Sequence, residues 1–348
     1  MRGEYKVVGG KLVVADVAVE NERLSQVSIS GDFFLQPDEA LNDINRALLQ
    51  QPVRASVAEL TAAIENALGE EVVMFGFSAQ AVAIAVRRAL GFASTWHDHC
   101  FSVIPAQKLP AAQHVALDEV MLAEIAEGRR GPTLRFWDWD DSLVVIGAFQ
   151  SVKNEIDAAG ARKHNINVVR RVTGGGAMFM EPGNCITYSL VVPESLVEGM
   201  SFEQSYAFLD SWVLGALAEV GIEARYEPLN DITSPAGKIG GAAQKRSRGW
   251  VLHHVTMAYD INADRMLEVL RIGREKMSDK GTKSANKRVD PMRSQTGMSQ
   301  ADIVAAFIEF FLSNYPATLS EYTAAELNQA QALMHSKFLQ EEWLYKVP

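Results

Sequence analysis

Only two cysteines, Cys100 and Cys185, occur in the 348-residue sequence, too few for a disulfide framework. Long apolar runs are also absent: the longest, such as Leu143–Phe149, have the length of a strand, whereas a membrane span needs about 18–20 apolar residues. The first residues carry no apolar segment of the kind that a secretion signal needs. We therefore expect a soluble, cytoplasmic protein without a membrane partner.

An excess of basic residues is missing as well. The 33 Lys and Arg are outnumbered by 43 Asp and Glu, which gives a formal net charge of −10. A general nucleic-acid binder needs a basic face that releases counterions, so we expect no nucleic-acid partner. Two stretches depart from this balance: seven basic and two acidic residues lie between Arg271 and Val289, and Lys238–Arg248 contains four basic residues and no acid. They indicate either an anionic ligand or a solvated loop.

The pattern of the first 92 residues predicts a small α+β unit. Strands are expected over Leu12–Val19 and Leu24–Ser30, and helices after Pro37, after the capping box Ser56–Glu59 and over residues 79–90. No cluster of titratable residues occurs in this unit, so we expect a structural or docking role for it.

Regular periodicity lapses over residues 93–110, which we expect to form a linker. Residues 111–348 then alternate strands and helices. The elements expected there cover residues 114–127, 133–139, 143–149, 156–164, 167–171 and 251–259, with further helices starting at Ser201, Ser299 and Thr323.

The most informative segment joins a strand to three consecutive glycines. Two valines lead into Arg170 and Arg171, and Gly174–Gly176 follow shortly afterwards. Consecutive glycines let backbone N–H groups approach an anion, and arginine offers a planar fork for carboxylate or phosphate. The spacing matches neither the dinucleotide fingerprint nor the Walker loop. A tight hairpin is the alternative, but it does not account for the paired arginines.

A second motif places Lys238 among small residues, within Gly237–Gln244 and shortly after Asn230-Asp231. A lysine in this setting can extend its amine into a site while the backbone lies close to a ligand. Its point charge suits an α-phosphate or a carboxylate that gains charge in a transition state. A lysine in a surface turn is the alternative interpretation.

Histidines occur close together at two places. His253-His254 enters a strand, where a buried structural role is the commoner interpretation of either one. Residues 97–100 (His-Asp-His-Cys) have metal-ligating side chains, but neighbouring side chains of a strand point to opposite faces. The two histidines would then share a face without the other two ligands, so we expect no metal site there.

Together these motifs resemble those of lipoate–protein ligases of the A type. The resemblance covers about residues 111–348 and rests on Arg170–Phe179 with Gly183-Asn184, on Asn230–Gln244 and on Lys283–Val289. It implies an α+β catalytic domain with mixed sheets flanked by helices, the class II synthetase-like fold of biotin and lipoate ligases. Residues 1–92 are similar to the family's small α+β accessory domain, here fused in front.

The resemblance implies a two-step reaction that uses ATP and Mg²⁺. The lipoate carboxylate attacks the α-phosphate of ATP, which gives lipoyl-AMP and pyrophosphate. The amine of an acceptor lysine then attacks the mixed anhydride and releases AMP. The implied acceptors are the lipoyl domains of 2-oxoacid dehydrogenase complexes and the glycine cleavage H protein.

Carried over position by position, Lys238 and Asp231 are the implied catalytic residues. Lys238 would contact the carboxyl and α-phosphate oxygens, and Asp231 would position Mg²⁺ or the incoming amine. The residues implied to bind lipoate or ATP are Arg171, Thr173, Gly175, Gly176, Ala177, Met178, Phe179, Asn184, Gly241, Ala243 and His254. No resident metal ligand set is implied, and Met178, Phe179 and Ile186 could line an apolar slot for the acyl chain.

Two other functions stay open. An octanoyl- or lipoyltransferase, or amidotransferase, of the same fold resembles this chain but works through a cysteine in the loop before the lysine motif, and residues 227–236 contain none. Cys185 lies in an apolar strand, which favours a packing role. A non-catalytic lipoate- or adenylate-binding protein is the second alternative, because Met180-Glu181 and Val255 depart from the family's His-Asp and glycine. The arginine, lysine and aspartate of the motifs are nevertheless retained.

Overall fold

A computed structural model describes residues 1–7, 9–235, 237–271 and 291–347. The motif Lys283–Val289 and the basic stretch beyond Arg271 lie outside these residues. The chain divides into two compact units, one made of Met1–Asp98 with Glu194–Phe208 and the other of His99–Pro193 with Leu209–Pro348. In the part of the chain that is described, no helix combines the length and apolar character that crossing a membrane requires.

Three strands and three helices form most of the first unit. They are β1 (Arg2–Lys6), β2 (Leu12–Glu20), β3 (Arg23–Gly31), α1 (Ala40–Leu48), α2 (Val57–Ala67) and α3 (Ala79–Ala89), with a separate strand pair of β4 (Phe34–Gln36) and β5 (Val73–Phe75). α3 packs directly on β1, since a Cβ on Gly3 would lie 2.2 Å from the Ala85 carbonyl oxygen. The predicted capping box is confirmed: the Ser56 side chain accepts from the Glu59 N–H, and the Glu59 carboxylate accepts in return.

A segment from the middle of the chain completes this unit. Within Glu194–Phe208, Glu198 forms an ion pair with Arg87 (3.2 Å), and the Gly199 carbonyl accepts from the Gln80 amide (2.6 Å). The extended conformation expected for residues 97–100 is wrong in part, because Trp96–Asp98 form a 3-10 turn.

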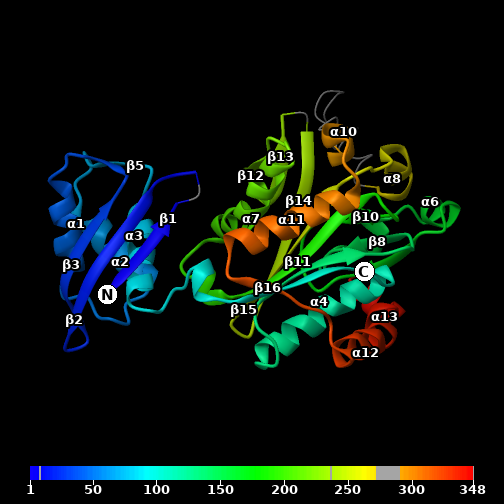
Figure 1. The fold of residues 1–348 in the computed structure, drawn as a ribbon, viewed down its shortest axis with the longest axis horizontal. Coiled ribbons are helices and arrows are strands. Elements are labelled where there is room, and N and C mark those ends of the chain that lie inside the picture. The colour runs from blue at the N-terminus through cyan, green and yellow to red at the C-terminus, as the bar shows by residue number, and fades with distance from the viewer. Residues whose placement is uncertain (8, 236, 272–290, 348) are drawn as a thin grey trace. The chain divides into compact units, whose positions relative to one another are not determined.

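An eight-stranded mixed sheet organises the second unit (Figure 1). Its strands, in spatial order, are β12 (Arg225–Glu227), β13 (Asp231–Ser234), β14 (Gly237–Ser247), β15 (Trp250–Ala258), β11 (Cys185–Pro193), β7 (Thr133–Asp138), β6 (Phe101–Lys108) and β16 (Ala317–Leu319). β6 lies inside the stretch expected as a linker, where it pairs in parallel with β7 and with β16. The other neighbours are antiparallel.

A second, smaller sheet carries the glycine-rich segment. In it β8 (Leu143–Ile146) lies between β9 (Asn167–Arg170), which is parallel to it, and β10 (Met178–Met180), which is antiparallel. The loop between β9 and β10 contains the three glycines. The helices described for this unit are α4 (Ala111–Ala126), α5 (Val152–Glu155), α6 (Ala158–Lys163), α7 (Phe202–Glu219, whose first residues cluster with the first unit), α8 (Ala263–Val269), α10 (Met292–Thr296), α11 (Gln300–Asn314), α12 (Ala324–Leu333) and α13 (Glu341–Leu344).

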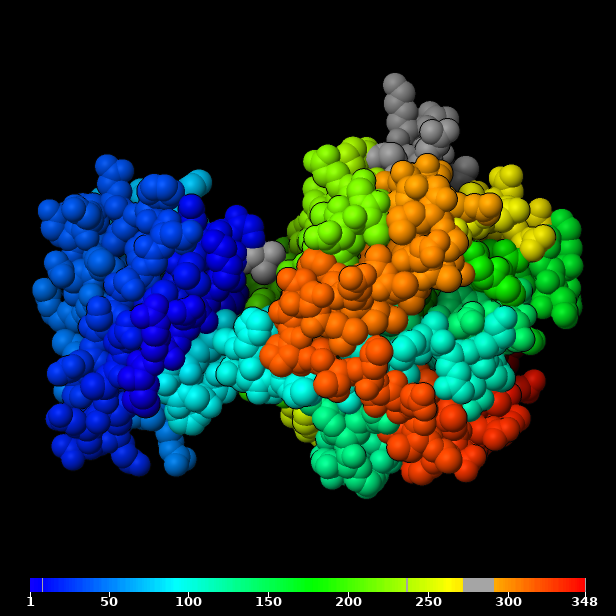
Figure 2. All heavy atoms as spheres, in the orientation of Figure 1, coloured from blue at the N-terminus to red at the C-terminus, as the bar shows by residue number. Residues whose placement is uncertain are grey.

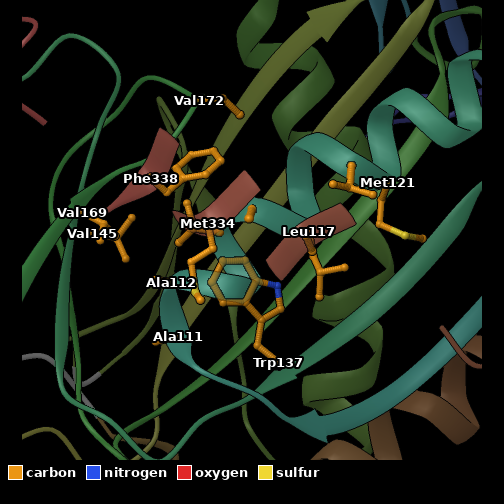
Figure 3. Packing of buried hydrophobic residues seen from close by; sticks show 14 of the residues in the cluster. Ala111, Ala112, Leu117, Met121, Trp137, Val145, Val169, Val172, Met334 and Phe338 are labelled. Carbon is orange, nitrogen blue, oxygen red and sulfur yellow. The ribbon is translucent and has the colours of Figure 1, made fainter. Parts of the chain in front are cut away.

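Both faces of the large sheet are covered. α4 is buried on one face, where Leu117 and Trp137 share a core with Met334 and Phe338 from the turn after α12 (Figure 3). On the other face Trp212 of α7 packs between Tyr188 and Phe311 of α11. Figure 2 shows the C-terminal helices (red) at the surface beside α4 (teal). The predicted α+β architecture with mixed sheets flanked by helices is confirmed.

Candidate active site

Two backbone segments meet closely at the glycine-rich loop. A Cβ on Gly147, at the end of β8, would lie 2.1 Å from the Gly175 carbonyl oxygen. Gly175 has a φ of +91°, which L side chains rarely adopt. The Ala148 N–H also donates to the Thr173 carbonyl at 2.8 Å. The loop after β9 is therefore held against β8 by contacts that require these two glycines.

The paired arginines have different roles. Arg170 is fully buried, and its guanidinium donates to the carbonyls of Gly147, Gln150 and Leu344 at 2.6–3.0 Å. Arg171 points to the loop instead, where it donates from Nε to Thr173 Oγ1 (2.8 Å) and from Nη2 to the Gly174 carbonyl (2.5 Å). Arg170 is thus a structural anchor, and Arg171 faces the candidate site.

A buried carboxylate lies behind the loop. Asp118 of α4 accepts from Arg135 Nη2 (2.5 Å) and from His254 Nδ1 (2.8 Å), and the other ring nitrogen of His254 lies 2.8 Å from Thr173 Oγ1. Burial alone would raise the pKa of Asp118, but the charge of Arg135 and the hydrogen bond from His254 lower it to about 2. Burial lowers the pKa of His254, and the neighbouring carboxylate offsets this only in part. The pair is therefore a carboxylate and a neutral imidazole at pH 7.

Lys238 extends from the start of β14 toward Asp231 on β13, with 2.7 Å between Nζ and Oδ1. Asp231 pairs in register with Gly241, and a Cβ on that glycine would lie 3.3 Å from the lysine Nζ. Asn230 fixes this hairpin, because its amide donates to the Ala242 carbonyl at 2.6 Å. The predicted arrangement of a lysine amine over small residues is thus present.

These elements surround a cavity of about 190 Å³. The predicted site residues that line it are Arg171, Gly176, Ala177, Met178, Phe179, Lys238, Gly241, Ala243 and His254. Apolar side chains that no motif indicated also line it, namely Cys185, Ala258, Ile261 and Met266, the last from α8. A cavity with cations beside apolar side chains suits a ligand that has an anionic head and an aliphatic tail.

Residues 110–312 match the model of the family described as the lipoyl protein ligase A/B catalytic domain. The chain belongs to this family.

Relatives of two kinds match this member of the lipoyl protein ligase A/B family. An octanoyltransferase LipM from Lysinibacillus sphaericus is 26% identical over 281 residues, which cover 73% of this chain and 99% of the relative. The solved bi-partite lipoate protein ligase of Thermoplasma acidophilum, described with its E2 lipoyl domain, is 29% identical with a TM-score of 0.62 and covers 71% of this chain and 97% of that one. A lipoate-protein ligase A bound with ATP is 26% identical with a TM-score of 0.61, covering 70% and 98%.

The predicted resemblance to lipoate–protein ligases is therefore confirmed, and the chain is an enzyme of the lipoate ligase and transferase type. The relatives' names divide between ligase and octanoyltransferase.

Four predicted site residues of this family member do not line the cavity. Asp231 reaches it through Lys238, Thr173 lies between Arg171 and His254, and Gly175 forms the close contact with β8. Asn184 is buried and fixes the turn before β11, since it accepts from the Glu181 N–H (2.9 Å) and donates to the Phe179 carbonyl (3.3 Å).

One expected lining residue is misplaced by a single position. Ile186 was expected in the acyl slot, but it is buried away from the cavity, and its neighbour Cys185 lines the cavity instead. Side chains alternate between the two faces of a strand, so β11 can present only one of these neighbours to the site. Asp118 was missed altogether, although it contacts the motif residue His254 directly.

Proposed function

We propose that this chain is an ATP-dependent lipoate–protein ligase. The observation that carries the proposal is the state of its two thiols. Cys185 lines the cavity but is 1% exposed, and its thiol donates to the Phe179 carbonyl at 3.6 Å. Burial raises the pKa of the Cys185 thiol, and the nearby Glu181 carboxylate adds to this effect. Cys100 precedes β6 and is not among the cavity-lining residues. A thioester-forming transferase needs an accessible thiolate at the site. Cys185 is buried, and Cys100 is exposed but lies outside the cavity lining, so neither cysteine meets this need.

In the first proposed step a lipoate carboxylate oxygen attacks the α-phosphorus of ATP, and the bond to pyrophosphate breaks. Charge develops on the phosphoryl oxygens, so catalysis needs fixed cations more than a nucleophile on the enzyme. Lys238 supplies one of these cations, since its amine can exchange its contact with Asp231 for a contact with substrate oxygens. The guanidinium of Arg171 supplies the second cation. The acyl chain would lie along Met178, Ile261 and Met266.

In the second proposed step the amine of an acceptor lysine attacks the acyl carbon of lipoyl-AMP. The amide forms, the carbon–oxygen bond to AMP breaks, and the departing phosphate keeps the electron pair. Lys238 again neutralises charge on the phosphate. Asp231 accepts a hydrogen bond from Lys238 at 2.7 Å, so it is well placed to accept from an incoming amine once Lys238 has turned to the substrate.

Mg²⁺ enters this proposal as part of MgATP. In such sites Mg²⁺ is bound largely through substrate phosphates with one or two carboxylates. Of the residues that are described, no three or more His, Cys, Asp or Glu lie together in a group that could hold a metal ion. Asp231 is the carboxylate nearest to Lys238, and it is the residue we assign to contact a phosphate-bound Mg²⁺.

The proposed partner is a lipoyl domain that carries the acceptor lysine, as in 2-oxoacid dehydrogenase complexes or the glycine cleavage H protein. The support is a relative, the Thermoplasma acidophilum ligase described with its E2 lipoyl domain. We further propose that the first unit is the accessory domain of the ligase. Its described residues contribute nothing to the lining of the cavity.

The test is lipoate-dependent exchange of labelled pyrophosphate into ATP by the full chain. We expect exchange in the wild type and in Cys185→Ala, because no thioester is formed. Octanoyl transfer is the second candidate, and the name of the Lysinibacillus sphaericus relative favours it. No exchange, together with octanoyl transfer from an acylated carrier protein that is lost in Cys185→Ala, would replace our proposal by this second candidate.

A further inference from the structure

We infer that Asp118 is a positioning residue, which acts through His254 and Thr173 to set the direction of the Arg171 guanidinium at the cavity. The reaction that it serves is the proposed one, so the inference rests on the proposed function. None of the motifs in the sequence contains Asp118.

Asp118 can only accept hydrogen bonds. It is 2% exposed, and Arg135 donates to its Oδ1 at 2.5 Å. Arg135 is itself 1% exposed and stacks over the ring of Trp137, so its charge has no solvent to balance it. An ionised carboxylate has no proton to give. The hydrogen bond between Asp118 Oδ2 and His254 Nδ1 therefore has its proton on the histidine.

The tautomer of His254 follows from this. A neutral imidazole carries one proton, and that proton is on Nδ1 facing Asp118. Nε2 is then an acceptor, and the group beside it, at 2.8 Å, is the Thr173 hydroxyl. The hydroxyl has a single proton, which it must donate to His254.

The oxygen of Thr173 is thereby left to accept, and it accepts from Arg171 Nε at 2.8 Å. The three hydrogen bonds that link these four side chains therefore run in one direction: Arg171 donates to Thr173, Thr173 to His254, and His254 to Asp118. Arg171 also donates to the Val145 and Gly174 carbonyls. On its Nε side the guanidinium is held by the Thr173 hydroxyl, and Asp118 on α4 determines, through His254, that this hydroxyl oxygen accepts.

Replacing Asp118 by asparagine would reverse the donor direction of the hydrogen bonds at His254. Arg135 can only donate, so it would hold the amide oxygen of the new side chain. The amide nitrogen would then face His254 Nδ1 and donate to it, which moves the histidine proton to Nε2. Thr173 would receive two donors and lose the acceptor for its own proton. We expect Arg171 to shift, and a displacement of this kind costs about 100-fold in rate.

The neighbouring histidine supplies a matched control. His253 points to the opposite face of the sheet, where its Nε2 lies 2.6 Å from Asp210 of α7 and its Nδ1 lies 3.1 Å from the Gln244 amide nitrogen. Both partners of this pair are fully buried. Asp210→Asn therefore removes a buried carboxylate beside a histidine of the same strand, but on the face away from the cavity.

The experiment combines kinetics with histidine NMR on the full chain. In the wild type, long-range ¹H–¹⁵N correlation should show His254 protonated at Nδ1 and His253 at Nε2, assigned with His254→Gln and His253→Gln. Asp118→Asn should move the His254 proton to Nε2 and lower kcat/KM for lipoate-dependent pyrophosphate exchange by about 100-fold. Asp210→Asn should leave kcat/KM of the folded protein close to wild type.

A wild-type His254 protonated at Nε2, or equal kinetic losses in Asp118→Asn and Asp210→Asn, would overturn the inference. If Asp118→Asn does not fold, Thr173→Val removes the hydroxyl with little change of shape. It should lose activity while His254 keeps its proton on Nδ1, and Thr173→Ser should restore activity. If the wild type shows no exchange at all, the proposed function fails, whereas the tautomer of His254 still decides whether the positioning chain exists.

Discussion

Lys238 and Asp231 face each other across neighbouring strands, with 2.7 Å between the amine and the carboxylate and Gly241 directly beneath them. Their side chains are 40% and 27% exposed. An ion pair this accessible contributes little to stability, at most about 1 kcal/mol. The amine is therefore available to a substrate anion at small cost to the fold.

Lys238→Ala should abolish both half-reactions and leave the fold intact. Removal of a single group that stabilises developing charge costs about 10²–10³ in rate, whereas substitutions of exposed side chains change stability by about 0.5 kcal/mol or less. The measurements are pyrophosphate exchange, transfer from preformed lipoyl-AMP, and thermal unfolding. Lys245→Ala is the control, because Lys245 lies on the same strand but does not line the cavity. Equal activity of Lys238→Ala and Lys245→Ala would show that Lys238 has no role in the reaction.

Gly147→Ala should displace the glycine-rich loop. The new methyl group would meet the Gly175 carbonyl oxygen at 2.1 Å, and overpacking of this kind costs about 1–3 kcal/mol. We expect a lower free energy of unfolding in urea and weaker binding of lipoate by calorimetry. Gly174→Ala is the control, since its nearest neighbour is the Phe149 ring at 3.7 Å, an ordinary contact. Loop displacement is disproved if both variants bind lipoate as the wild type does.

Arg170→Met should loosen the last helix of the described chain. Without the guanidinium, the buried Gly147 carbonyl and the half-buried Leu344 carbonyl lose this donor, and a buried unsatisfied group costs about 1–3 kcal/mol. Hydrogen exchange should therefore become faster in α13. Arg171→Met removes a neighbouring guanidinium that donates to Thr173, Val145 and Gly174, so exchange in α13 should stay at the wild-type rate. The same acceleration in both variants would contradict the separate roles of the two arginines.

His114 should make the protein less stable in mild acid. Burial, with the neighbouring Arg135, lowers the pKa of His114 to about 3, against about 6.5 in an unfolded chain. As the pH falls below about 6.5, His114 becomes protonated in the unfolded chain but stays neutral in the folded one. The free energy of unfolding therefore decreases until the pH approaches 3. The slope is at most about 1.4 kcal/mol per pH unit.

Urea unfolding at several pH values between 4 and 7 measures this slope. His114→Gln should reduce this slope by at most about 1.4 kcal/mol per pH unit, the contribution of one proton. His335 is exposed, so His335→Gln should leave it unchanged. If His114→Gln retains the full wild-type slope, other groups account for the acid sensitivity.

Local signals in the sequence predicted where many helices start. The capping boxes at Ser56 and Thr323 are both formed, and Ser299 caps α11 as expected. The helix expected over 156–164 is found as α6 but begins only at Ala158, and the short α5 before it had no local signal. Ile156 pairs with Leu270 in an isolated bridge, and this partner lies more than a hundred residues away, so no local pattern could reveal it.

The motifs predicted most of the residues that line the cavity, because the spacing of the glycines and of a lysine among small residues indicates where the backbone can approach a ligand. Asp118 carried no such signal. An aspartate on a helix is usually exposed, and only the packed fold places Arg135 and His254 on either side of it. Met266 reaches the cavity from a helix that no periodicity indicated.

Glu194–Phe208 belongs to the first unit although it lies in the middle of the sequence, and this affects any attempt to produce the two units as separate polypeptides. A cut after Asp98 does not separate two self-sufficient pieces, because the larger fragment keeps the segment whose Glu198 and Gly199 contact Arg87 and Gln80. The smaller fragment would expose the surface that this segment covers. Produced as separate polypeptides, the two pieces would have a built-in means of complementation, through which one fragment completes the fold of the other.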